Sequence, residues 1–323
     1  MQAYFDIENL SSFARSSAKE RFSDCFRMLK SHFDLIFNFP KNRLLEYPEL
    51  MMWITRMADG ARGSVSFLNE NVFPSRPLKS NTYKAFNKEQ LSAVYLLNDE
   101  RINSIASNGS IMYAGVGNEV DTLSTLIKDE DYSFDRELQI KKLRSWDEAL
   151  NGQVVPTTDI IIQDRYILSD ESLYDTNLYS LIGNLCQKVH NTSVNIIIFT
   201  LHSFQQFTPE WGTIRSRIKS LVKGITGQEP KVTFVLQHRM KEHDRIIFTN
   251  YQYIVSGDSF NYFDSQGNVI TGGEFLRIQS MARNEYYTNA MAFIDRMQGN
   301  INKLKVINPE GIKFDKSSLY LHF

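Results

Sequence analysis

The sequence predicts an α/β protein with two domains. In the second half of the chain, short apolar runs alternate with stretches of helical periodicity, the pattern of a layered α/β domain. A length of 323 residues with 42% apolar residues supports a sizeable core. Asn151, Gly152 and Pro156 form the best boundary. We therefore expect a mixed α/β domain over 1–152 and a second domain over 153–323.

The first half begins with the apolar run Gln2–Phe5 and continues with mostly helical patterns. Phe22, Phe26 and Leu29 recur at helical spacing, and Pro40 stops the apolar run that follows them. We expect strands at 33–39 and 110–116, and helices at 11–31, 48–57, 88–97 and 134–150.

The second half alternates more regularly. Leu178, Leu181 and Leu185 line one side of a helical stretch, and Pro209 stands near the first turn of another. We expect strands at 159–163, 166–168, 195–201, 231–237, 246–255 and 274–279, with helices at 170–190, 209–224 and 284–297.

Composition excludes several classes of protein. The formal net charge of −1 provides no whole-protein field for nucleic acid or membrane. Cys25 and Cys186 are far apart and indicate free thiols in a reducing cytoplasm, and no Cys/His spacing typical of zinc occurs. The start of the chain lacks the pattern of a signal peptide, and no apolar run reaches membrane-spanning length. We expect a cytoplasmic protein without a cofactor.

The most informative motif begins at His243. His243, Arg245 and Asn250 follow the spacing of the phosphodiesterase signature His-x-Lys-x4-Asp, and Gly257, Ser259 and Asn261 fill its trailing Gly-Ser-x-Asn with one inserted residue. Residues i and i+2 of a strand share a face, so His243 and Arg245 would project side by side. A histidine there is a candidate nucleophile, and arginine binds phosphate as a planar fork. Asn250 cannot support an imidazolium as aspartate does.

The segment beginning at Gln163 repeats this spacing. Gln163 aligns with His243, Arg165 with Arg245, and Asp170 with Asn250. Glutamine is neither a nucleophile nor a general acid, so the two segments do not assemble a two-histidine site within one monomer. A symmetric dimer would pair two copies of His243. The alternative for the His243 segment is a plain strand, with His243 capping a turn and Arg245 in a surface ion pair. The alternative for the repeat is a chance similarity of two Asp-Arg strands. His202 ends another strand and is a further candidate for the same cleft.

Residues 155–280 resemble the phospholipase D-like domain found at the C-terminus of proteins with a microtubule-interacting-and-transport domain, and its bacterial relatives. The resemblance rests on short pieces: Asp164 to Ile167, Asn177-Leu178, Thr200-Leu201, His243 to Arg245, Gly257, and 260–263. It implies a phospholipase D-like layered sheet with helices. It also implies that binding of lipids or protein partners is common without hydrolysis, and that bacterial forms belong to multi-protein defence complexes.

The N-terminus offers a different candidate site. Asp6, Glu8 and Asn9 after a short strand resemble the opening of PIN-like RNases, in which an acidic residue at a strand end holds a metal ion. Glu119 and Asp121 are the candidates for the further carboxylates that such a site needs. The favoured alternative is that Asp6 and Asn9 cap a helix starting near residue 11.

The leading hypothesis is a phosphate-ligand- or partner-binding protein with a degenerate phospholipase D-like site. Its candidate ligand-binding residues are Arg245, Asn250, Ser259, Asn261, Arg165 and His202. The locally basic segment 215–245 makes nucleic acid or another phosphate-bearing ligand plausible, and a protein partner or a homodimer is expected. The alternatives are a phosphodiesterase or nuclease with His243 as nucleophile, and a metal-dependent RNase acting through Asp6 and Glu8.

Overall fold

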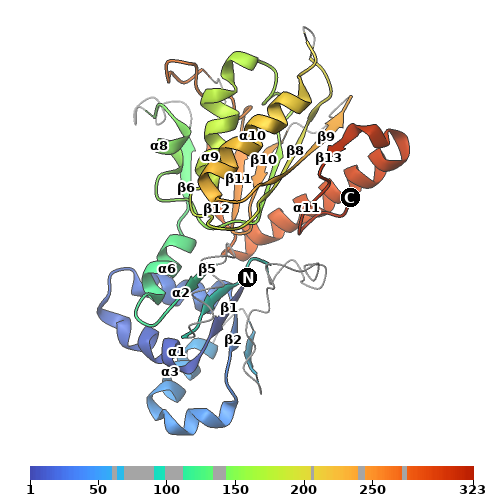
Figure 1. Cartoon of the computed structure of the whole chain (residues 1–323). Helices are drawn as coiled ribbons and strands as arrows, with labels where there is room; N and C mark the ends of the chain where they lie inside the picture. The colour runs from blue at the N-terminus through green and yellow to red at the C-terminus, as the bar shows by residue number, and fades with distance from the viewer. Residues whose placement is uncertain are drawn as a thin grey trace. The chain divides into compact units, whose positions relative to one another are not determined.

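The protein forms two compact units, shown in Figure 1. The computed structural model describes residues 1–59, 64–68, 91–98, 112–133, 143–204, 207–238, 244–270 and 275–323. The N-terminal unit comprises 1–128 and 280–288, and the C-terminal unit comprises 129–279 and 289–323. Both units combine a sheet with helices, so the predicted α/β class is confirmed.

A five-stranded parallel sheet is the base of the N-terminal unit. Its strands are β1 (Gln2–Phe5), β2 (Asp34–Phe37), β3 (Val65–Phe67), β4 (Val94–Leu96) and β5 (Met112–Ala114). They lie in the order β3-β2-β1-β4-β5, and all the pairs are parallel. The order reverses between β1 and β4, so their carboxyl ends flank a topological switch point, where α/β sheets commonly bind ligands.

The helices of the N-terminal unit differ from the prediction in two places. They are α1 (Ile7–Arg15), α2 (Phe22–His32), α3 (Pro48–Ala58) and α6 (Glu119–Leu126), with 3-10 turns at Ser16–Ala18 and Lys41–Glu46. The single helix expected over 11–31 is wrong, because the backbone is extended at Lys19 and left-handed at Arg21 with φ of 63°. The helix expected over 88–97 is wrong for 94–96, which form a buried strand instead; 88–90 lie outside the described residues.

The C-terminal unit contains an eight-stranded mixed sheet in the order β13-β9-β8-β7-β10-β11-β12-β6. The strands are β6 (Glu130–Ser133), β7 (Asp159–Gln163), β8 (Asn195–Leu201), β9 (Lys231–Gln237), β10 (Arg245–Phe248), β11 (Gln252–Ser256), β12 (Phe275–Ser280) and β13 (Ile312–Phe314). The strands β7, β8 and β9 are parallel, whereas β10 is antiparallel to both β7 and β11. The strands predicted at 159–163, 195–201 and 231–237 are confirmed. The run at 246–255 is a hairpin rather than one strand, and 166–168 is not a strand.

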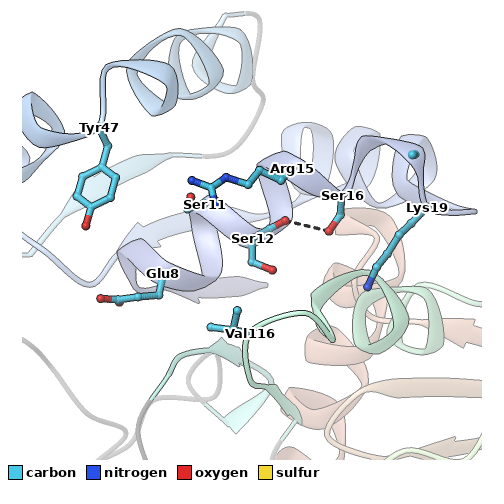
Figure 2. A pocket seen from close by; sticks show the side chains of 9 residues that line it. Glu8, Ser11, Ser12, Arg15, Ser16, Lys19, Tyr47 and Val116 are labelled. Atoms are coloured by element: carbon cyan, nitrogen blue, oxygen red, sulfur yellow. Dashed lines mark hydrogen bonds between the residues drawn. The ribbon is translucent and has the colours of Figure 1, made fainter.

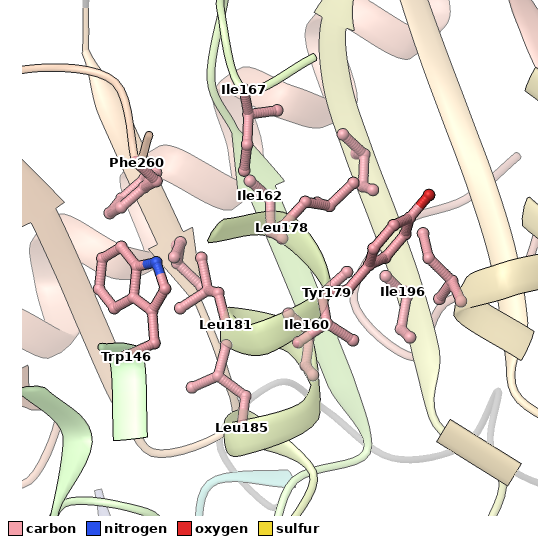
Figure 3. Close-up of a cluster of buried hydrophobic side chains, with 14 of the residues drawn as sticks. Trp146, Ile160, Ile162, Ile167, Leu178, Tyr179, Leu181, Leu185, Ile196 and Phe260 are labelled. Carbon is pink, nitrogen blue, oxygen red and sulfur yellow. The ribbon is translucent and has the colours of Figure 1, made fainter. Parts of the chain in front are cut away.

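Helices cover both faces of this sheet. They are α8 (Trp146–Leu150), α9 (Ser180–Leu185), α10 (Trp211–Thr226) and α11 (Asn284–Ile307), whose residues 284–288 belong to the N-terminal unit. Two 3-10 turns lie at Glu171–Leu173 and Pro309–Gly311, and a π-helical turn lies at Asp175–Tyr179. Alternate strand residues such as Ile160 and Ile162 pack against Leu181, as Figure 3 shows. On the other face, Phe293 of α11 lies 6.2 Å from Tyr253 between ring centroids.

The division between the units lies between 128 and 129 rather than at 152. Trp146 explains this difference, because its indole is fully buried in the core of the C-terminal unit, beside Phe260. The strand β6 also pairs with β12. Of the helix expected over 134–150, only Trp146–Leu150 is helical within the described part, and 134–142 lie outside it.

Candidate functional site

Polar side chains gather at one edge of the C-terminal sheet, where β7, β8 and β9 end and β10 begins. The strand β7 runs into Asp164 and Arg165, and β8 runs into His202. Because β10 is antiparallel to β7 with Ile246 opposite Gln163, Arg245 lies beside Asp164. The hairpin β10–β11 then returns the chain to this edge at residues 257–261.

Asp164 holds the returning loop in place. Its carboxylate is completely buried; one oxygen accepts from the backbone N–H of Tyr166 at 2.8 Å. The other oxygen accepts from Ser259 Oγ at 2.8 Å and from the N–H of Phe260 at 2.7 Å. Burial raises the pKa of Asp164 to about 6, against the opposing effect of these hydrogen bonds and of Arg245. Ser259 is therefore fixed on the loop whose Gly257 carbonyl accepts a hydrogen bond from Arg245.

Asn177 fixes the same loop from the helical side. Its Oδ1 accepts from the N–H groups of Tyr262 and Phe263, and its Nδ2 donates to the Phe263 carbonyl at 2.7 Å. Asn177 belongs to the residues that carry the resemblance, but no role was predicted for it. The sequence around Asn177 gave no specific signal, because Asp175, Thr176, Ser180 and Asn184 stand in the same helical stretch. In the structure its buried amide finds the hydrogen-bond partners that burial requires.

Arg245 is held at the edge with part of its guanidinium unused. Nη1 donates to the carbonyl of Gly257 at 3.2 Å, and Nη2 lies 3.9 Å from Asp258 Oδ1. The side chain is 17% exposed. Its Nε is buried and has no hydrogen-bond partner among the described residues.

Arg165 presents a second cation at the end of the neighbouring strand. Its guanidinium lies 5.3 Å from the centroid of the Tyr166 ring, and its Nε is also buried without a hydrogen-bond partner in the described part of the chain. Asn261 joins the group because its Nδ2 donates to the Tyr166 carbonyl at 2.8 Å. The structure thus brings together Arg165, Arg245, Ser259 and Asn261 of the predicted ligand-binding set.

Two histidines lie further along the same edge. His202 follows β8 and His238 follows β9, with ring centroids 5.0 Å apart. Burial lowers the pKa of His202, as do His238 and Lys313, which disfavours the charged form of its imidazole. Two strand spacings separate β8 from β10, roughly 10 Å. His202 is therefore at the predicted edge but is not adjacent to Arg245. Sequence analysis did not place His238 in the site.

The structure places Asn250 away from this site. Asn250 follows β10 at the opposite end from Arg245, about 16 Å away at the rise of a strand. It is completely buried, and its Oδ1 accepts from Thr157 Oγ1 at 2.7 Å and from the N–H of Thr158 at 2.7 Å. Its predicted role as a ligand contact is therefore replaced by a structural one. His243, the candidate nucleophile, lies outside the described residues.

The side chains of Gln163 and Asp170, in the segment predicted to repeat the His243 motif, make hydrogen bonds to the backbone. Gln163 Nε2 donates to the carbonyl of Asp244 at 2.8 Å, and Asp170 accepts from the N–H of Ser172 at the start of a 3-10 turn.

In the basic segment 215–245, several cations of α10 are ion-paired. Arg215 lies 2.7 Å from Asp315, and Lys219 lies 2.9 Å from Glu229. These pairs reduce the positive charge that α10 offers to an anion.

Asp6 lies at the switch point of the N-terminal sheet and caps α1. Its Oδ1 accepts from the N–H of Asn9 at 2.8 Å, and its Oδ2 accepts from the N–H of Asn98 after β4. Burial raises the pKa of Asp6 to about 6. The capping role of Asp6 is confirmed, although α1 begins at Ile7. Asn9 is not a cap, because its Nδ2 donates to the carbonyl of Ala114 and to Glu119.

The remaining N-terminal candidates do not form a metal site with Asp6. Glu119 is fully buried, and its carboxylate accepts from Asn9, Ser12 and the N–H of Gly117. Glu8 is exposed. Together with Arg15 and Lys19 it lines a cleft of about 680 Å³, shown in Figure 2. Among the described residues, no group of three or more side chains that bind metals comes together. The carboxylates therefore do not fit a metal centre of the PIN-like kind.

No protein-family model and no curated protein matches this chain. In the described part of the chain, no helix is long and apolar enough to cross a lipid bilayer.

Proposed function

We propose that the C-terminal unit binds a phosphate-bearing ligand at the edge formed by Arg165, Arg245, Ser259 and Asn261. One observation carries this proposal: two arginines lie at adjacent strand ends, and each keeps a buried Nε without an acceptor in the described chain. An unsatisfied buried donor is costly, and an oxyanion would satisfy both donors. Arginine is well suited to this task, since its planar fork matches phosphate geometry.

The proposed role is binding rather than hydrolysis. Asp164, the carboxylate at the centre of the site, is occupied by three hydrogen bonds that hold the loop. Gln163, which aligns with His243 in the repeated segment, hydrogen-bonds the backbone and supplies no general acid. The described residues thus include side chains that would position a phosphate. A catalytic group beside Arg245 that would work together with His243 is not found among them.

We also propose that this unit is a phospholipase D-like domain. The connection from Arg245 through the β10–β11 hairpin back to Ser259 supports this assignment, because it makes two distant parts of the motif neighbours. The ligand would then be a phosphodiester, carried by a phospholipid or a nucleic acid. The alternative function keeps Arg245 as a phosphate contact and takes His243, which lies outside the described residues, as the attacking nucleophile.

Parallel assays of hydrolysis and binding separate these two functions. Bis(p-nitrophenyl) phosphate, phospholipid vesicles and a single-stranded oligonucleotide serve as substrates for wild type and His243→Ala. We expect no turnover above background and unchanged ligand binding in the variant. Hydrolysis that His243→Ala abolishes, with the melting temperature unchanged, would establish the phosphodiesterase instead.

A further inference from the structure

A basic cleft lies in the N-terminal unit, beside the packed helices α2 and α6 of Figure 1. Its volume is about 520 Å³, within the usual range of small-molecule sites. Its cationic lining comes from three separate segments. Arg21 and Arg27 belong to the start and middle of α2, Lys128 follows α6, and Arg283 precedes α11.

The lining charges are strongly unbalanced. Four lining side chains carry a permanent positive charge, and Asp24 is the one acid among the lining residues. Asp24 is already engaged, because its Oδ1 accepts from Arg27 Nη2. His32 adds no acid to the lining; its Nδ1 accepts from the N–H of Asn284 at 3.4 Å. Positive charges that line one cleft favour an anion between them.

Several hydrogen-bond donors of the cleft are not used by the described residues. The guanidinium of Arg21 and the hydroxyl of Ser31 make no hydrogen bond to the described part of the chain. The first turn of α2 has no side-chain cap. Arg21 also holds a left-handed backbone, which is uncommon outside glycine. This conformation marks the point where the chain turns into α2, beside the cleft.

We propose that this cleft binds a compact oligophosphate group. Cationic donors from three segments surround it, and none of its described lining residues is an aromatic side chain other than histidine. The cleft therefore recognises phosphate oxygens, and its described lining has no phenylalanine, tyrosine or tryptophan on which a base would stack. The site belongs to the N-terminal unit and does not depend on the ligand proposed for Arg165 and Arg245.

Calorimetric titration with sodium tripolyphosphate tests this site in the full chain. The titration uses an Arg165→Gln/Arg245→Gln background, so the outcome is independent of the site in the C-terminal unit. Adding Arg21→Gln/Arg27→Gln is expected to weaken binding by at least about tenfold, the loss of one or two charged hydrogen bonds. Arg43→Gln/Arg56→Gln is the matched control; it removes the same charge from the same unit outside the cleft and should change affinity less than about twofold.

Two further ligands define what the cleft recognises. ATP should bind within about threefold of tripolyphosphate, because the cleft contacts phosphates only. No saturable binding of tripolyphosphate, or equal weakening by the two double variants, would overturn the proposal. Tighter binding of an oligonucleotide without terminal phosphates would also overturn it, since the cleft would then bind a nucleic-acid strand.

Discussion

Ser259 Oγ donates a hydrogen bond of 2.8 Å to Asp164 Oδ2, joining residues that are 95 positions apart. This contact attaches the loop after β11 to the end of β7. Arg245 is placed between them by the β7–β10 pairing and by its own bond to Gly257. The candidate site thus depends on a buried carboxylate that holds the loop and leaves the two arginines to bind the ligand.

Removing this hydrogen bond should destabilise the protein measurably. Ser259→Ala is expected to lower the free energy of unfolding by about 1.5–3 kcal/mol, the value for a bond to a charged group. Urea denaturation measures this change. Ser203→Ala, at an exposed serine of the same unit, should change stability by less than about 0.5 kcal/mol. Equal effects of the two substitutions would contradict the role given to Ser259.

Asn250 and Asn261 should behave in opposite ways. Asn250→Ala leaves several buried donors without an acceptor and should cost about 2–4 kcal/mol of stability, with ligand affinity unchanged once the protein is folded. Asn261→Ala removes a group at the proposed site and should weaken binding while costing less than about 1 kcal/mol. Thermal melts combined with ligand titrations distinguish the two. Loss of binding in Asn250→Ala at full stability would return Asn250 to the site.

The sequence was sufficient for the strands of the C-terminal core and for part of the site. Runs such as Asn195–Leu201 are buried on both faces, so composition alone identifies them. Arg245 and Ser259 were predicted together because both fit the spacing of the phosphodiesterase signature, although a single strand was expected over 246–255. The role of Asn250 could not be predicted, because spacing does not tell which end of the hairpin a residue occupies. The break at Arg21 was missed because its left-handed conformation has no glycine to mark it.

Stability should fall as pH rises from about 4 to about 7. Burial raises the pKa of Asp6 and Asp164 to about 6 and that of Asp159 to about 7, from 3.8 in the unfolded chain. Between these values the folded state holds protons that the unfolded state has released, so unfolding becomes easier with increasing pH. Melting temperatures across this interval measure the trend. A rise in melting temperature from pH 4 to pH 7 would contradict it.

Asp6→Asn tests whether Asp6 is only a cap. Asparagine also caps helices, so we expect a loss of at most about 1 kcal/mol. Asp59→Asn, at an exposed position of the same unit outside the candidate carboxylates, serves as the control. Stability and RNA hydrolysis in the presence of Mg²⁺ or Mn²⁺ are measured together. A ribonuclease activity that Asp6→Asn removes at unchanged melting temperature would restore the metal-dependent RNase hypothesis.

The central claim is that Arg165 and Arg245 bind one phosphate-bearing ligand. Titration with the phosphodiester glycerophosphocholine and with a single-stranded oligonucleotide, for wild type, Arg165→Gln and Arg245→Gln, tests it most directly. Each substitution should weaken binding by about 1.5–3 kcal/mol, or roughly 10- to 150-fold. Arg277→Gln, an exposed arginine of β12 paired with Asp131, should leave the affinity within about twofold. Affinities that neither Arg165→Gln nor Arg245→Gln changes would contradict the proposed site.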